Sequence, residues 1–125
     1  MGDPHDDPGL TLADHVIAIT QIHGIAGRRS DLRALMRSTE QRTAAEPGCV
    51  QYRFAAALDD PDEYVNVQEW ASEEAWRAHQ TSPAFRDYQH GLFELLARPS
   101  EMKIHRHAET TIPEPSGPPD PRTVD

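Results

Sequence analysis

Three hydrogen-bonding side chains recur at every second position of one short segment. Asn66, Gln68 and Trp70 alternate with Val65 and Val67. Because a strand directs alternate side chains to opposite faces, the polar groups share one face and the valines share the other. Amides and an indole N–H can stabilise an oxygen anion, so we predict that Asn66 and Trp70 bind oxygen atoms of a small molecule. A core indole beside a strand-edge amide would give the same pattern.

His79 is the titratable side chain that best fits a proton-transfer role. Its spacing places it on an apolar helix face with Ala75 and Trp76. A neutral imidazole in such a place can accept a proton from a phenol or an activated methylene. A hydrogen-bonded structural histidine would occupy the same position, so both interpretations stay open.

The other histidines and the single cysteine give no comparable signal. His105 and His107 share a strand face and His15 and His23 lie on another strand, but no carboxylate stands at a matching spacing. Cys49 opens an apolar strand without an adjacent activating histidine, which favours a packing role. We therefore expect no metal site. A phosphate-binding glycine loop is also missing, so we expect no bound flavin or nicotinamide cofactor.

Composition and charge exclude several classes of partner. The chain has 125 residues, 37% of them hydrophobic, and a net charge of −9 from 12 basic and 21 acidic side chains, which fits one small domain. Without a clustered basic stripe, nucleic acid is not an expected partner. Without a long apolar run or a secretory pattern, we expect no membrane association and a cytoplasmic protein.

The two ends of the chain differ from its centre. Residues 1–10 and 108–125 together hold seven of the eleven prolines, and seven acidic side chains against one basic one. Such segments bury too little apolar surface to fold. We therefore predict a disordered acidic tail over residues 1–13, a folded domain over residues 14–107 and a disordered proline-rich tail over residues 108–125.

Hydrophobic period and turn residues divide the central part into strands and helices. Strands are expected at 15–22, 49–57, 63–70 and 101–107, with Val50, Tyr52 and Phe54 on one face of the second strand. Helices are expected at 30–45, capped by Ser30, and after the capping residues Ser72 and Ser82. This β, α, β, β, α, β order predicts an α+β fold with a ferredoxin-like split βαβ topology, in which helices cover one face of a four-stranded antiparallel sheet. The other face must also be covered, so we expect a homodimer that packs sheet on sheet.

Four motifs in this chain resemble those of a known family. They are Glu46-Pro47-Gly48-Cys49-Val50-Gln51-Tyr52, Glu69-Trp70, Ser72-x-Glu74-Ala75-Trp76-x-x-His79 and Ser82-Pro83-x-Phe85. In this order and spacing, over about residues 15–107, they resemble the antibiotic biosynthesis monooxygenase (ABM) domain family of the dimeric α+β barrel superfamily. The resemblance implies a pocket between the sheet and the helices.

The resemblance also implies roles for individual residues. Anthrone-oxidising members have an Asn and a Trp at the spacing of Asn66 and Trp70, where they hold the substrate carbonyl and stabilise the oxygenated intermediate. With His79 as a candidate base, these two residues form the predicted catalytic set. The predicted pocket walls are Phe54, Gln68, Trp76, Phe85, Tyr88, Gln89 and Leu92.

Haem-degrading relatives suggest a different ligand. They bind iron through a histidine four residues after the Phe of the Ser-x-x-Phe turn. This chain has Gln89 there, and the adjacent His90 is rotated off the helix face that carries Phe85 and Leu92. Haem is therefore the less favoured ligand.

The resulting hypothesis is a cofactor-independent monooxygenase that uses dioxygen to convert an aromatic or polyketide-type phenol, anthrone or quinol to a quinone. Such a protein needs only to bind, orient and desolvate a substrate that supplies its own electrons. The first alternative is a ligand-binding dimer or biosynthetic accessory protein without turnover. The second alternative is a haem-degrading monooxygenase.

Overall fold

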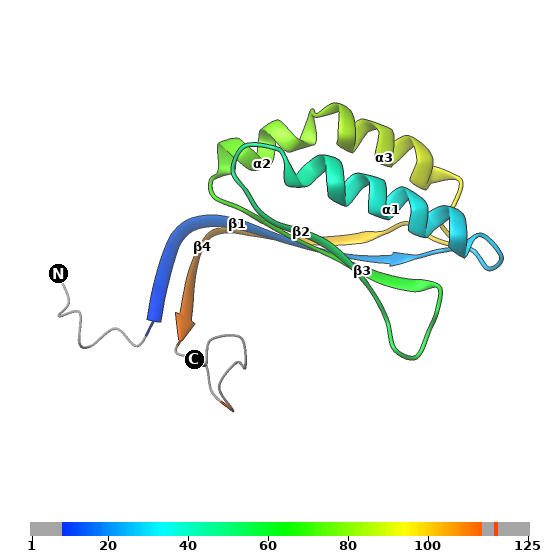
Figure 1. The fold of residues 1–125 in the computed structure, drawn as a ribbon, viewed down its shortest axis with the longest axis horizontal. Coiled ribbons are helices and arrows are strands. Elements are labelled where there is room, and N and C mark those ends of the chain that lie inside the picture. Colours follow the sequence, from blue (N-terminus) through cyan, green and yellow to red (C-terminus); the bar gives the residue numbers. More distant parts are fainter. Residues whose placement is uncertain (1–8, 114–116, 118–125) are drawn as a thin grey trace, which may run out of the picture.

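The fold is an α+β sandwich of one sheet and one helical layer. The computed structural model describes residues 9–113 and Gly117. Helices α1, α2 and α3 cover one face of an antiparallel sheet with strand order β2-β3-β1-β4, as Figure 1 shows. The predicted ferredoxin-like topology is confirmed. The elements are β1 (Gly9–His23), α1 (Arg29–Ala44), β2 (Cys49–Ala56), β3 (Glu63–Trp70), α2 (Glu73–Gln80), α3 (Pro83–Phe93) and β4 (Glu101–Pro113).

Local capping chemistry explains where two of the three helices begin. The Ser72 hydroxyl at the start of α2 and the Ser82 hydroxyl at the start of α3 each accept a hydrogen bond from the backbone N–H three residues later. Helix α1 was expected to be capped by Ser30, and this is wrong. Its N-cap is Arg28, which makes no capping hydrogen bond and instead pairs with Asp31 in the first turn at 2.6 Å.

A β-bulge at the start of β2 changes the expected side-chain phase. We expected Val50, Tyr52 and Phe54 to share one face. The register shifts between Cys49 and Gln51, and Val50 is 51% exposed as a result. Cys49 is half-buried instead and packs against the cluster that contains Tyr52.

The ends of the folded domain lie further out than the sequence predicted. We expected tails at 1–13 and 108–125, but β1 begins at Gly9 and β4 ends at Pro113, and these two residues are paired. Asp14 and His107 both have positive φ. The part of β1 before Asp14 and the part of β4 after His107 bend away from the sheet as a two-stranded ribbon (Figure 1). Composition missed this because each segment satisfies its backbone hydrogen bonds only through the other. Apart from Gly117, the rest of the predicted tails lies outside the described residues.

Two buried clusters fill the space between the sheet and the helices. The larger joins Ile22 and Tyr64 of the sheet to α1 and α3, and the smaller surrounds Trp70 and Trp76. Phe54 packs against both clusters. The predicted alternation along β3 is confirmed, because Tyr64, Asn66, Gln68 and Trp70 are buried and the residues between them are half-buried.

Candidate functional site

The side chains on the helix-covered face of β3 form a chain of hydrogen bonds. Trp70 Nε1 donates to Gln68 Oε1 at 3.0 Å, and Gln68 Nε2 donates to Asn66 Oδ1 at 2.9 Å. Asn66 Nδ2 then donates to the backbone carbonyl of Arg53 at 3.2 Å. All three side chains are at most 2% exposed. The amide nitrogens of Asn66 and Gln68 each carry two hydrogens and use one of them in these hydrogen bonds, so each can donate one more hydrogen bond.

A cavity of about 120 Å³ lies beside this chain, between the sheet and α3. The two amide side chains supply its polar wall. Apolar and phenolic side chains supply the rest. The lining residues are Thr20, Tyr52, Asn66, Gln68, Phe85, Tyr88, Gln89, Leu92, Ser100 and Met102. The structure thus brings six predicted site residues, the two amides and four from α3, to one cavity.

Thr20 is a cavity residue that the sequence analysis missed. It lies opposite Asn66 in the β1·β3 register and is 7% exposed. Its hydroxyl has no hydrogen-bond partner among the described residues. An unpartnered buried hydroxyl costs free energy, which a ligand that hydrogen-bonds to it would recover. The signal was a threonine in phase with Ala18 and Ile22, in a strand where that phase is otherwise apolar.

Two buried phenols, Tyr52 and Tyr88, complete the hydrogen-bonding capacity of the cavity. Burial raises the pKa of both hydroxyls well above the ordinary value of 10.0, and for Tyr52 the neighbouring phenol and Glu46 raise it further. Both phenols therefore stay protonated near neutral pH. They can donate hydrogen bonds to an oxygen atom but are poor proton acceptors.

His79 is fully buried behind the cavity and pairs with a carboxylate. Its Nδ1 lies 3.1 Å from Glu46 Oε1, and its ring stacks on Trp70 with centroids 4.7 Å apart. Burial lowers the pKa of His79 despite the opposing effect of the carboxylate, so the imidazole is neutral. When Nδ1–H donates a hydrogen bond to Glu46, the lone pair is on Nε2. The Nε2 atom has no hydrogen-bond partner within the described residues. Glu46 stands in one of the motifs that carry the family resemblance, but its contact with His79 was not predicted.

Four predicted site residues lie outside the cavity wall. His79 is one of them. Its imidazole contacts the rings of Tyr52 and Phe85, which do line the cavity. Trp70 lies in the core and reaches the cavity only through Gln68.

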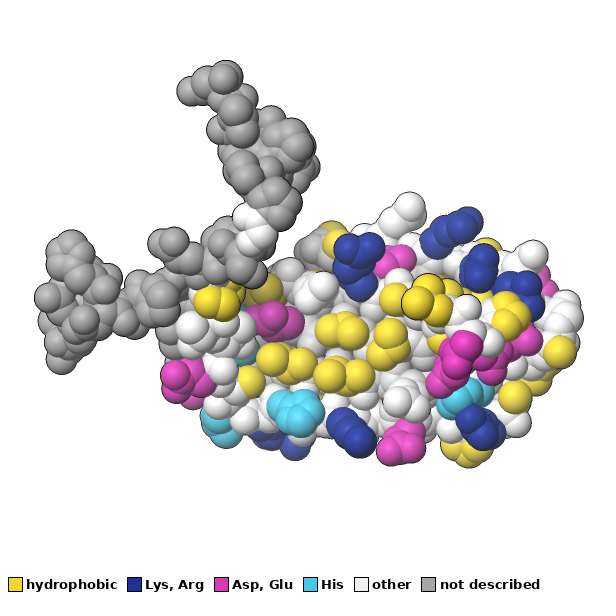
Figure 2. Space-filling view, turned by 90° about the horizontal axis from the view of Figure 1, so that it is seen from below, with side chains coloured by type: hydrophobic (Ala, Val, Ile, Leu, Met, Phe, Trp, Pro, Cys, Tyr) yellow, Lys and Arg dark blue, Asp and Glu magenta, His cyan; other side chains and the backbone are white. Residues whose placement is uncertain are grey.

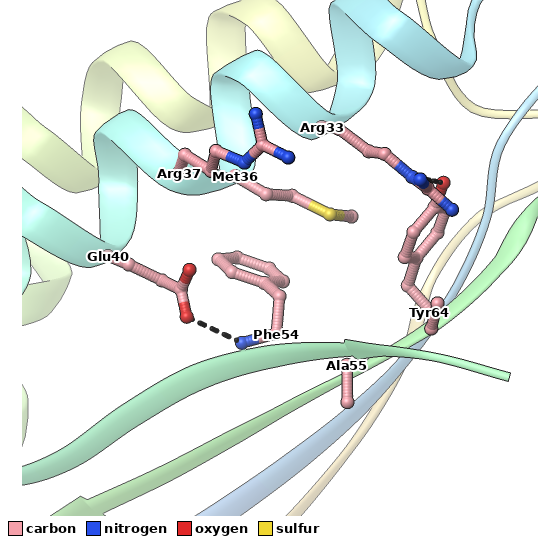
Figure 3. Close-up of a pocket in the computed structure, with 8 residues that line it drawn as sticks. Arg33, Met36, Arg37, Glu40, Phe54, Ala55 and Tyr64 are labelled. Atoms are coloured by element: carbon pink, nitrogen blue, oxygen red, sulfur yellow. Dashed lines mark hydrogen bonds between the residues drawn. The ribbon is translucent and has the colours of Figure 1, made fainter.

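The remaining two of these four are aromatic. Trp76 packs in the core under the Arg106 guanidinium, which lies 5.1 Å from its ring. Phe54 lines a separate outer hollow, shown in Figure 3.

Several other titratable side chains lie in pairs of opposite type. His15 Nδ1 lies 2.5 Å from a Glu69 carboxylate oxygen, and Arg106 Nε lies 2.8 Å from a Glu73 carboxylate oxygen. Within residues 9–113 no cluster of three or more His, Cys, Asp or Glu side chains could hold a metal ion. None of the described helices is long and apolar enough to cross a membrane.

Comparisons with known proteins agree with the ferredoxin-like fold. Residues 15–91 match the sequence profile of the antibiotic biosynthesis monooxygenase family. The solved structure of Rv0793 from Mycobacterium tuberculosis is 30% identical with a TM-score of 0.70, over 75% of this chain and 95% of that one. This chain belongs to the antibiotic biosynthesis monooxygenase family.

Two further relatives are more distant. SnoaB from Streptomyces nogalater, a cofactor-independent oxygenase, is 23% identical with a TM-score of 0.68, over 78% of this chain and 97% of that one. This likeness shows the shared fold. An uncharacterized Synechocystis protein, sll1783, is 26% identical over 97 residues, which are 78% of this chain and 66% of that protein's length.

Proposed function

We propose that this protein is a cofactor-independent monooxygenase that oxidises a phenol, anthrone or quinol to a quinone. The observation that carries the proposal is the pair of buried amides at the cavity wall, each with one further N–H to donate. Donors held in place by a hydrogen-bond chain stabilise a developing oxygen anion without reorganising, and this lowers the barrier to its formation.

The chemistry proposed for an anthrone uses the substrate as the electron source. Loss of a proton from the methylene gives a carbanion, which passes one electron to dioxygen, and the two radicals combine to form a C–O bond. The peroxide then loses its O–O bond and the second methylene proton, leaving a carbonyl and one water molecule. Asn66 and Gln68 would hold the oxyanions, while Trp70 fixes the Gln68 amide.

His79 is the proposed acceptor of the first proton. It is a neutral imidazole whose Nδ1 is oriented by Glu46, and its Nε2 is unpartnered among the described residues. Tyr52 and Phe85 stand between it and the cavity, so the transfer needs a shift of one of these rings. A general base contributes about 10²- to 10⁴-fold to a rate. His79→Gln should therefore lower kcat by at least about 100-fold, and an unchanged kcat would assign His79 a structural role alone.

The homodimer is part of the same proposal. The face of the sheet away from the helices is called the open face below. By strand register it carries an apolar row of Ile17, Ile19, Ala55, Val65 and Val67. Figure 2 shows hydrophobic side chains across the middle of this face. Ile19 is 37% exposed and the valines are half-buried in the single chain. A second copy packed on this row would remove the row from water, because a two-fold dimer can use the same surface on both subunits.

The test is oxygen uptake by the purified protein with anthrone and with 1,4-dihydroxynaphthalene, after dialysis against a metal chelator. The proposal expects uptake with quinone formation above the autoxidation rate, and loss of that excess in an Asn66→Ala, Gln68→Leu double variant. Binding of either compound without uptake would favour the ligand-binding alternative.

The structure weighs against haem as the ligand. Gln89 lines the cavity, and His90 is exposed on the outer side of α3. The cavity of about 120 Å³ is also small for a porphyrin. A haem titration that shifts the Soret band would overturn this conclusion.

A further inference from the structure

A second hollow of about 250 Å³ lies between α1 and the edge strand β2. In Figure 3, Arg33 and Arg37 extend from α1, and Met36 and Phe54 meet between the helix and the strand. The hollow thus has an apolar floor beneath two guanidinium groups. Tyr64 closes one end and Glu40 the other.

The two arginines have no carboxylate partner in the part of the chain that the structure describes. Arg33 Nε donates to the Tyr64 hydroxyl at 3.0 Å, which leaves its terminal nitrogens available, and Arg37 makes no ion pair there. Arg42, five residues after Arg37 on α1, does pair with a carboxylate, that of Asp87. In a chain of net charge −9, two unneutralised guanidiniums four residues apart on one helix face are a local site for an anion.

Glu40 limits which anions fit. Its carboxylate accepts a hydrogen bond from the Phe54 backbone N–H at 3.2 Å, which fixes it at the far end of the hollow. It repels a second negative charge on a ligand and can accept a hydrogen bond from a ligand hydroxyl. A singly charged ligand with a flat apolar body and a hydroxyl group fits this set of contacts.

Phe54 separates the outer hollow from the inner cavity. Its ring lines the hollow, and its centroid lies 5.6 Å from those of Tyr52 and Tyr88, which line the cavity. Sites for small molecules commonly measure about 300–1,000 Å³. Neither space alone reaches that range, but the two joined by a turn of the Phe54 ring do.

We propose that the outer hollow is the entry subsite for a flat aromatic carboxylate, bound through its carboxylate by Arg33 and Arg37. Phe54 turns aside to let the ring system extend to the amides of the inner cavity. This inference rests on the proposed function for the fate of the ligand and names its class, a hydroxylated aromatic acid with one negative charge.

The test measures binding of 1-hydroxy-2-naphthoate and of its neutral methyl ester by calorimetry. Arg33→Gln and Arg37→Gln should each weaken binding of the naphthoate about 10- to 100-fold, because each removes a charge-assisted hydrogen bond, and should leave the ester unchanged. Arg86→Gln is the matched control, since Arg86 is an exposed arginine on α3. Equal loss for both ligands, the same loss in the control, or no binding by the wild type would overturn the proposal.

The Phe54 step is tested with Phe54→Leu and Phe54→Ala, each checked for folding by circular dichroism. Both should speed association of the naphthoate at least about threefold in stopped flow, while the arginine variants slow it; unchanged association in the folded Leu variant would refute the role of Phe54. Oxygen uptake is scored separately. Arginine-dependent binding without uptake would keep the entry subsite and reject the monooxygenase.

Discussion

The two faces of β3 have opposite relations between polarity and burial. On the helix-covered face, Asn66 and Gln68 are 2% and 1% exposed, and their amides lie inside the protein. On the open face, Val65 and Val67 are only half-buried. Minimising free energy of a single chain would place these side chains the other way round, because buried amides need partners and exposed valines lose burial.

Each departure fits one of the proposed contacts with a molecule outside the single chain. The two amides are hydrogen-bonded to each other, to the Arg53 carbonyl and to the Trp70 indole. Each amide still has one N–H that a ligand could accept. The valines form a surface that gains stability only against another surface. Buried polarity on one face supports the proposed ligand binding, and exposed apolarity on the other supports the proposed dimer.

The largest expected effect comes from charging the open face. Val65→Asp combined with Val67→Asp places two carboxylates in the proposed dimer interface, where each unpaired charge costs several kcal/mol. The dimer dissociation constant should rise at least about 1,000-fold, measured by analytical ultracentrifugation. Val65→Ile with Val67→Ile keeps the surface apolar and should leave the dimer intact. A wild-type protein that is monomeric at micromolar concentration would end this half of the comparison.

The helix-covered face is tested next through Asn66. Asn66→Ala removes a positioned donor, and loss of one such donor costs about 10²- to 10³-fold in kcat. The steady-state rate of oxygen uptake should fall by that factor while the oligomeric state stays unchanged. Gln51→Ala removes an exposed amide from β2 and serves as the control with wild-type kcat. Equal rates for both variants would mean that Asn66 is a structural residue only.

Much of this comparison could be predicted from local sequence. The period of two along residues 63–70 separates amides from valines without knowledge of any partner strand, and Ser72 and Ser82 mark helix starts by contacts within one turn. The helical period likewise separates Gln89, which lines the cavity, from His90, which does not.

The remainder depends on contacts between distant residues. Glu46 meets His79 across 33 positions, and Gly9 meets Pro113 across almost the whole chain, so neither contact leaves a local periodic signal. The bulge at Val50 is set by the register with β3, which a single strand does not specify. The outer hollow around Phe54 likewise depends on how α1 packs over β2.

A smaller effect concerns the pH dependence of stability through His79. Burial lowers the pKa of His79 below its ordinary value of 6.5, so the unfolded chain binds the proton at a higher pH than the folded chain. The contribution of the neutral imidazole is complete above pH 6.5 and is lost as pH falls from there towards the folded pKa.

Thermal unfolding across this window checks the sign. The Tm of the wild type should fall on acidification below pH 6.5, and His79→Gln should flatten the slope while lowering Tm at pH 7.5 through a loss of about 1–3 kcal/mol. His90→Gln changes an exposed histidine and should keep the wild-type slope. An unchanged slope in His79→Gln would assign the acid sensitivity to other groups.

The smallest effect tests whether a group on the helix-covered face lowers the stability of the fold and strengthens ligand binding. Thr20→Val replaces a buried hydroxyl without a described partner by a methyl group of similar size. Removing an unsatisfied polar group should raise the free energy of unfolding by about 1 kcal/mol, measured by urea denaturation. The same variant should weaken binding of 1-hydroxy-2-naphthoate, because the cavity loses a hydrogen-bonding group. Val67→Thr makes the reverse change on the open face and should alter monomer stability by less than about 0.5 kcal/mol. A destabilised Thr20→Val protein would show that the hydroxyl already makes a hydrogen bond in the folded chain and is not available to a ligand.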